Sequence, residues 1–268
     1  MTPAARTTAQ AGATPSTGTG VCLDVSGLRK SFGGVHAVRD CTFQAAEGAI
    51  TGLIGPNGAG KTTAFNLITG VLKPTAGHVT FRGIDVSGLP AHRMSAAGIG
   101  RTFQVTRVFE DMSVLENVVI HASKGAMRAF LSPRVTKAER ERARSLLDFL
   151  GLTRLTHDPA GSLSYGQRKL LELAGVLMAE PKMIMLDEPA GGVNPRLLDE
   201  IVERIRELNK SGVTFLIVEH NMDLVMSLCD SVVVMADGRV LRQGHPRDIQ
   251  ADEEVLSAYL GGSVGGAR

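Results

Sequence analysis

Residues 55–63, GPNGAGKTT, restrict the possible folds more than any other stretch of this chain. The apolar run AITGLI before them is typical of a strand, and the run TAFNLITG that follows is typical of a helix. A strand that leads through a glycine-rich turn into a helix directs successive backbone N–H groups, and the positive end of the helix dipole, at one point. The stretch fits the pattern G-x-x-x-x-G-K-[ST] and predicts a phosphate-binding loop in an α/β fold.

Each part of this loop has a chemical role. Glycines let the backbone approach phosphate oxygens without a Cβ atom in between. Lys61 supplies a mobile positive charge for the β- and γ-phosphates, and the Thr62 hydroxyl is a ligand for Mg²⁺. We expect the nucleotide to contact the whole loop, namely Gly55, Pro56, Asn57, Gly58, Ala59, Gly60, Lys61, Thr62 and Thr63.

Polar side chains also stand at the ends of other strand-like runs. MIMLDEP contains Asp187 and Glu188, VTFLIVEH ends in His220, and GIGRTFQ ends in Gln104. The carboxyl ends of parallel strands meet at the edge of a sheet where α/β proteins bind ligands. We expect Asp187 in the Mg²⁺ shell and Glu188 to polarise an attacking water. Taken alone, His220 is more typical of a structural residue, and Gln104 of a turn residue after a strand.

Composition excludes several classes of partner. The formal net charge of +2 gives no basic face for nucleic acid, and Trp is absent. The three cysteines have no metal-ligand spacing, which is typical of buried thiols in a reducing compartment. No run reaches the ~20 apolar residues that span a bilayer. We expect a peripheral protein that serves a membrane only by docking onto another one.

The rest of the chain predicts an α/β domain over residues 21–262, with flexible tails at 1–20 and 263–268. Turn signals predict short antiparallel strands at CLDV, CTFQA, AITGLI and HVTFRG. Helical spacing is seen at 113–122 and 137–150, where Ala138, Ala143, Leu146, Leu147 and Leu150 share one side. The stretch 123–136 fits an amphipathic insert or a surface loop.

Beyond Leu163 the pattern alternates between helices and apolar strands. Continuous apolar strands between helices indicate a parallel sheet that is covered on both faces. A two-stranded segment, SVVVMADGRVLRQG, turns at Asp237-Gly238. The strands are KMIMLD and VTFLIV, and the helices are expected at about 164–179, 196–209 and 221–228.

The stretch LSYGQ, residues 163–167, is a possible second phosphate-binding segment, about a hundred residues after the loop at 55–63. Ser164 stands where a helix N-cap would be, and an uncapped N-terminus offers N–H donors and a partial positive charge. The same residues are also compatible with an ordinary capped helix start. The residues themselves leave both interpretations open.

The order GPNGAGKTT, Gln104, LSYGQ, LDEP and His220 resembles the ATPases of ABC transporters, over nearly everything from Leu23 to Gly261. The resemblance implies a P-loop core, an N-terminal antiparallel β subdomain and a helical subdomain at about 105–180. It implies ATP and Mg²⁺ as cofactors, with catalytic roles for Glu188, His220 and Gln104, and with Gln104 also at the metal.

In this family two ATPase subunits pair head to tail, which implies that each signature contacts the γ-phosphate held by the other subunit. The signature residues are Ser164, Tyr165, Gly166 and Gln167, and the usual LSGGQ has Gly in place of Tyr165. Phe32 matches the segment that stacks on adenine, where Tyr is commoner. Asn194 lies in the loop that touches the partner, where many members carry Asp.

Among ABC ATPases, the segments FGGVHAV, RTFQVTRVFEDMSVLENV and EHNMDLVMSLCD resemble the ATPase of high-affinity branched-chain amino acid importers. The resemblance implies permease subunits that dock at residues 104–112, with Arg107 and Phe109 as candidate anchors. It also implies an extracytoplasmic solute-binding protein and a location at the cytoplasmic side of the membrane.

Two other functions are compatible with the same motifs. The ATPases of lipopolysaccharide export are similar in length and carry the same sequence signals. A soluble ABC ATPase acting on DNA or ribosomes is less compatible, because such proteins usually carry a long coiled-coil insertion or a second cassette. A simple GTPase or kinase would leave LSYGQ without a role.

Overall fold

The computed structural model describes residues 20–102, 107–122 and 135–261. The expected tails at 1–20 and 263–268, the stretch 123–136 and Gln104 lie wholly or almost wholly outside these described residues. No helix in the described ranges is both long enough and apolar enough to cross a membrane.

Within the described residues the strands form one mixed sheet of ten, in the order β5-β4-β1-β2-β10-β9-β3-β8-β7-β6. The first five strands along the chain are β1 (Val21–Phe32), β2 (Val35–Ala46), β3 (Ile50–Ile54), β4 (Ala76–Phe81) and β5 (Ile84–Asp85). The others are β6 (Ile99–Arg101), β7 (Met183–Asp187), β8 (Thr214–Val218), β9 (Ser231–Ala236) and β10 (Arg239–Gly244).

The centre of the sheet is parallel and the N-terminal part is antiparallel. Strand β3 pairs in parallel with β8 and β9, and β8 pairs in parallel with β7. The predicted turn at Asp237-Gly238 is confirmed, since β9 and β10 pair antiparallel around it. The loops that follow β3, β7 and β8 therefore leave the same edge of the sheet.

One strand assignment was wrong. AITGLI was expected among the short antiparallel strands, whereas β3 belongs to the parallel centre. Nothing local distinguishes the two pairings in a five-residue apolar run, because both alternate side chains between the faces of the sheet. The truly antiparallel strands β1 and β2 are also longer than expected, at 12 residues each.

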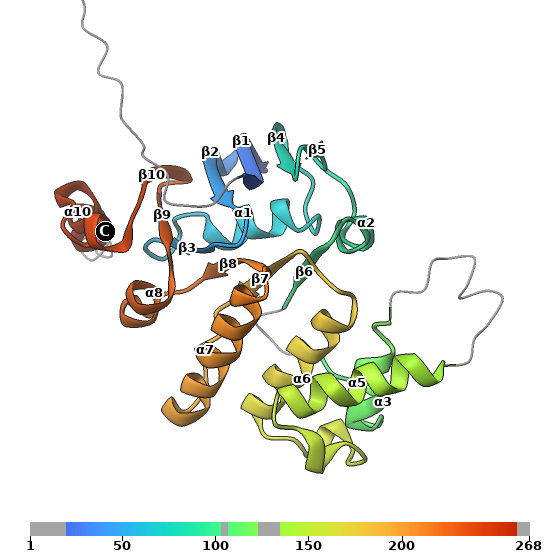
Figure 1. Ribbon diagram of the computed structural model, residues 1–268. Helices are drawn as coiled ribbons and strands as arrows, with labels where there is room; N and C mark the ends of the chain where they lie inside the picture. The colour runs from blue at the N-terminus through green and yellow to red at the C-terminus, as the bar shows by residue number, and fades with distance from the viewer. Residues whose placement is uncertain (1–19, 103–106, 123–134, 262–268) are drawn as a thin grey trace, which may run out of the picture.

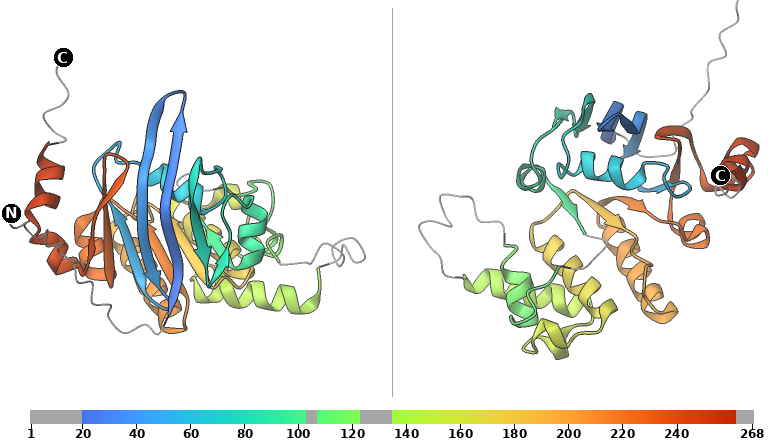
Figure 2. Two further views of the ribbon diagram at one scale, coloured as in Figure 1. Left: turned by 90° about the horizontal axis from the view of Figure 1, so that it is seen from above. Right: turned by 180° about the vertical axis from the view of Figure 1, so that it is seen from behind.

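Helices cover both faces of the central strands (Figures 1 and 2). Helix α1 (Lys61–Ile68) lies on one face, while α7 (Pro195–Lys210) and α8 (Met222–Leu228) lie on the other. The other helices of the described ranges are α2 (Ala91–Ala97), α3 (Val114–Val119), α5 (Lys137–Phe149), α6 (Tyr165–Met178), α9 (Pro246–Gln250) and α10 (Glu253–Gly261), with short 3₁₀ turns at Thr153–Leu155 and Ala160–Ser162.

The core explains why the central strands are apolar at every position. In β7, Met183 and Met185 face the cluster that contains Phe65 of α1, whereas Ile184 and Leu186 face the opposite cluster. All five residues of β7 are buried. Burial of each such side chain stabilises the fold by roughly 1.5–3 kcal/mol. Covered on both faces, the strand shows no polar alternation.

Helices α3, α5 and α6 pack on one another at one side of the sheet, and we name them the helical group (Figure 1). Each begins with a reciprocal capping box, formed by Ser113 with Glu116, Thr136 with Glu139, and Ser164 with Gln167. In α5 the predicted apolar side is correct for Ala143, Leu147 and Leu150, with Leu146 packed at its margin. Ala138 is exposed, in the first turn of α5.

Candidate functional site

The loop between β3 and α1 has the geometry of an anion cradle. A Cβ atom on Gly55 would lie 2.1 Å from the Met235 carbonyl oxygen, and one on Gly60 would lie 2.5 Å from that of Ala37. Gly60, the N-cap of α1, has φ +95°, and no side chain caps the helix. The first N–H groups of α1 are therefore available to an anion, with the helix dipole behind them.

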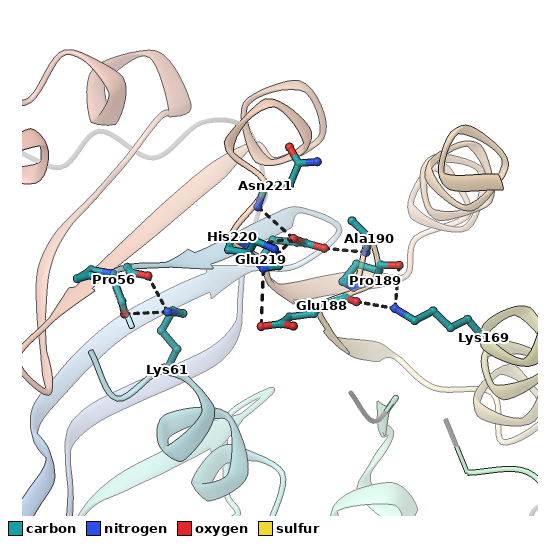
Figure 3. A network of polar contacts seen from close by, with 10 residues as sticks. Pro56, Lys61, Lys169, Glu188, Pro189, Ala190, Glu219, His220 and Asn221 are labelled. Atoms are coloured by element: carbon teal, nitrogen blue, oxygen red, sulfur yellow. Dashed lines mark hydrogen bonds and ion pairs between the residues drawn. The ribbon is translucent and has the colours of Figure 1, made fainter. Parts of the chain in front are cut away.

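Lys61 is the first residue of α1 and lies inside the cradle. Its ammonium donates to the carbonyl oxygens of Gly55 at 2.6 Å and Pro56 at 3.0 Å (Figure 3). Burial lowers the pKa of this ammonium, and the nearby Glu188 carboxylate opposes the shift. A phosphate would supply the same kind of acceptor with a full negative charge, which forms a stronger hydrogen bond.

Asp187 ends strand β7 and is buried, with 5% of its surface exposed. Burial raises the pKa of this carboxyl, and the Arg101 guanidinium, 3.6 Å from Oδ2, opposes the rise. A divalent cation would also favour the ionised form. A carboxylate and the exposed Thr62 hydroxyl are hard oxygen donors, which suits Mg²⁺.

Glu188 follows in an uncommon backbone conformation. Its φ is +50°, in the left-handed region that residues with a Cβ atom seldom adopt. Its N–H donates to the carbonyl oxygen of Val218 at 2.9 Å, at the end of the neighbouring strand β8. The left-handed residue turns the chain sharply at the strand end, and its side chain stays partly exposed at the sheet edge.

Charged side chains surround this turn, as Figure 3 shows. Nδ1 of His220 lies 3.8 Å from Oε1 of Glu188. The buried Glu219 accepts the N–H groups of Ala190, His220 and Asn221. Lys169 donates to the carbonyl oxygens of Glu188 and Pro189. The strand-end residues Asp187, Glu188 and His220 are thus gathered at one edge, near Lys61.

The stretch LSYGQ starts helix α6 with its own cap. The Ser164 hydroxyl accepts the Gln167 N–H at 3.3 Å, and Oε1 of Gln167 accepts the Ser164 N–H at 2.9 Å. The uncapped N-terminus considered from the sequence is therefore wrong for the single chain. Tyr165 is 42% exposed. Gly166 is buried so tightly that a Cβ atom would lie 2.0 Å from Cδ2 of Leu197.

Other predicted residues are placed as follows. Phe32 is half exposed at the end of β1, with the Lys30 ammonium 5.1 Å from its ring centre. Asn194 caps α7 by accepting the Leu197 N–H at 3.0 Å. Gln104 lies outside the described residues, so its expected contacts stay a prediction.

A hollow of about 510 Å³ lies between the central sheet and the helical group. Its lining is mainly apolar, and it includes both candidate anchors of the stretch 104–112, Arg107 and Phe109. Phe109 is 53% exposed. His121, also in the lining, packs against Gly175 of α6, where a Cβ atom would lie 2.7 Å from the imidazole ring.

Three further residues at this edge, Lys169, Glu219 and Arg101, lie outside the predicted motif positions. Glu219 had a usable signal, since a carboxylate directly after five buried strand residues requires partners. Arg101 had a similar one, as the last residue of β6, and it bonds Asn66, Thr69 and the carbonyl of Thr102. Lys169 had none, because its partners are about 20 residues away in the sequence.

Comparisons with known proteins agree with this geometry. The family model described as "ABC transporter" matches residues 38–191. The chain is similar to the high-affinity branched-chain amino acid transport ATP-binding protein BraF of Pseudomonas aeruginosa, with 40% identity over 89% of this chain and 97% of that protein. It is 39% identical to the corresponding LivG protein of Escherichia coli K12, with the same coverage.

Solved structures show the same fold. One of them is an ATP-binding cassette of an ABC transporter in its ADP conformation, which is 36% identical to this chain, with a TM-score of 0.81. The match covers 91% of this chain and 100% of the cassette. A dimeric cassette in a post-hydrolysis state, bound to ADP and Pi, is 25% identical, with a TM-score of 0.73, and covers 84% of this chain and 99% of that one.

Proposed function

This chain belongs to the ABC transporter family, and we propose that it hydrolyses ATP to power the import of branched-chain amino acids through separate permease subunits. The proposal of substrate class follows the names of its relatives, which match nearly full length on both sides. The observation that carries the catalytic part is the strand-end carboxylate Glu188, held beside His220 and near Lys61.

The residues of the cradle bind and orient the triphosphate. The N–H groups at the start of α1 and the Lys61 ammonium contact phosphate oxygens. Thr62 and Asp187, with a predicted third contribution from Gln104, would hold Mg²⁺, which would supply positive charge at the phosphate oxygens. Glu188 accepts a proton from the attacking water, and His220 orients that water toward the γ-phosphate.

The signature residues complete the site in a second subunit. Ser164, Tyr165, Gly166 and Gln167 begin α6, in the helical group, whereas the cradle begins α1 on the sheet. Pairing two copies head to tail brings the start of each α6 to the nucleotide of the other. A relative of the same fold forms a dimer bound to ADP and Pi, which supports this arrangement. Phe32 stacks on adenine, and Asn194 contacts the partner.

The mainly apolar hollow between the sheet and the helical group is the docking site for a permease helix. Phe109 and Arg107 are the anchors, since exposed aromatic and arginine side chains dominate binding energy at interfaces. The subunit is then peripheral, at the cytoplasmic side of the membrane. A solute-binding protein on the other side delivers the amino acid.

Glu188→Gln tests the catalytic assignment. The amide has the size of the carboxylate but accepts no proton, so we expect ATP turnover to fall by two orders of magnitude or more while nucleotide affinity is retained. Gel filtration with ATP should show an accumulated dimer. Glu200→Gln, a surface change on α7, is the matched control and should hydrolyse ATP normally. Normal turnover of Glu188→Gln would refute the role of Glu188.

Gentle extraction of the tagged chain from membranes tests the partners. We expect permease subunits to copurify, and we expect Phe109→Ser to release them without loss of ATP binding. ATP-dependent leucine uptake by vesicles containing the recovered complex tests the solute. Recovery of a lipopolysaccharide-export permease, or copurification with ribosomes, would refute the import assignment.

A further inference from the structure

Lys169, near the start of α6, is hydrogen-bonded to the backbone of the turn that carries Glu188 and Pro189, which we name the catalytic turn. Its ammonium donates to the Glu188 carbonyl oxygen at 2.7 Å and to that of Pro189 at 3.1 Å (Figure 3). These two bonds fix the orientation of two successive peptide planes. The Cα atom of Glu188 belongs to the first of these planes, the peptide that joins Glu188 to Pro189, so the direction of the Glu188 side chain depends on how that plane is held.

The catalytic turn needs such support because Glu188 is strained. A residue with a Cβ atom in the left-handed conformation costs about 1–2 kcal/mol. The end of β8 supplies two hydrogen-bond acceptors to this turn: the Val218 carbonyl oxygen accepts the Glu188 N–H, and the Glu219 carboxylate accepts the Ala190 N–H. Lys169 supplies contacts of the opposite polarity, and it comes from the helical group.

The start of α6 packs on the same loop. The Tyr165 ring lies against Gly192, where a Cβ atom would be only 2.9 Å from the ring, and the Lys169 ammonium lies 5.4 Å from the centre of that ring. Tyr165 belongs to the signature, one helical turn before Lys169. A displacement of α6 therefore reaches the turn through Lys169, since a hydrogen bond of 2.7 Å is lost after about 1 Å of stretching.

We propose that Lys169 is a positioning residue that ties the orientation of Glu188 to the position of the signature helix. This rests on the proposed function, in which that helix contacts the nucleotide of the second subunit. When Ser164 contacts the nucleotide held by the second subunit, Lys169 then fixes the orientation of the Glu188 carboxylate, which acts on the nucleotide of its own subunit. Lys169 itself touches neither nucleotide.

Lys169→Met tests this role because methionine keeps the chain length but donates no hydrogen bond. We expect kcat to fall at least tenfold, while the KM for ATP stays within twofold of the parent value. In the Glu188→Gln background, in which the dimer accumulates, Lys169→Met should change ATP-driven dimer formation by less than twofold. Lys169→Arg, which also donates to carbonyls, should recover kcat to within threefold of the parent chain. Lys137→Met, at an exposed lysine of α5, is the matched control and should be unchanged.

A double variant separates positioning from general damage. If Lys169 acts through Glu188, Lys169→Met should not lower the residual turnover of Glu188→Gln any further, because residues that act as a unit are non-additive. An equal fold-loss in both backgrounds, or full activity of Lys169→Met, would overturn the proposal. Normal turnover by Glu188→Gln alone would instead refute the proposed role of Glu188.

Discussion

The carboxylate of Glu219 holds the backbone N–H of Ala190 at 2.7 Å, across the edge between β8 and the loop after β7. Its second oxygen accepts the N–H groups of His220 and Asn221 at 3.0 and 3.2 Å. One buried side chain thus sets the spacing between the turn that carries Glu188 and the turn that carries His220. Glu188 and His220, the two proposed catalytic groups, are thus held at a set spacing by the contacts of Glu219.

Replacing Glu219 by Gln should therefore damage both stability and catalysis. The amide offers one acceptor oxygen, and its NH₂ group would face an N–H donor. We expect the free energy of unfolding in urea to fall by about 1–3 kcal/mol, the range for an unsatisfied buried polar group. We also expect kcat to fall at least tenfold. Unchanged kcat in Glu219→Gln would contradict the positioning role of this carboxylate.

A second prediction concerns the packing of the signature. A Cβ atom on Gly166 would overlap Cδ2 of Leu197 at 2.0 Å, so Gly166→Ala should lower the free energy of unfolding by about 1–3 kcal/mol through overpacking. Leu197→Ala removes the overlapping atom. In denaturant titrations the double variant should therefore lose less than the sum of the single losses. Strict additivity would show that glycine is not required there for packing.

The sequence predicted the parts of this site that lie within one strand and its following turn. GPNGAGKTT, Asp187 with Glu188, and His220 each follow a buried strand, and the parallel order of β3, β8 and β7 brings them to one edge. Contacts between distant segments were not predictable in this way. The bonds from Lys169 to the catalytic turn depend on how the helical group packs against the sheet, which no local pattern specifies.

The fold shows the same division. The buried strands and the helices after Leu163 were predicted within about two residues, because apolar runs and capping residues are local signals. The pairing direction of β3 was mispredicted, since direction depends on the neighbours that the strand acquires. A capped helix start at Ser164 was one of the two interpretations that the sequence left open. Gln167, the last residue of LSYGQ, closes the capping box, and a glutamine at that position is compatible with both interpretations.

The thiols give a prediction on pH. All three free cysteines are buried, and burial raises the pKa of Cys41 and Cys229 to about 12. The fold thus favours the neutral thiol, so this contribution to stability is present below the ordinary pKa of 9.0 and is lost as pH rises toward 12. Iodoacetamide at pH 8 should label the native chain far more slowly than the chain in concentrated guanidinium. Equal labelling rates would contradict the burial of these thiols.

The last prediction concerns the C-terminal helix and the phosphate loop. The Tyr259 hydroxyl on α10 lies near the backbone of Gly55, the first residue of that loop, and this contact opposes the rise that burial causes in the pKa of Tyr259. Tyr259→Phe keeps the ring, which packs on the core, but removes the polar group beside the Gly55 backbone, at a cost of about 1 kcal/mol. Because Gly55 fixes where the loop leaves β3, we expect the KM for ATP to rise at least threefold with kcat within twofold.

Leu256→Ala, at an exposed position of the same helix, is the matched control and should leave the KM for ATP unchanged. A KM that is equal in Tyr259→Phe and Leu256→Ala would show that the hydroxyl does not hold the loop.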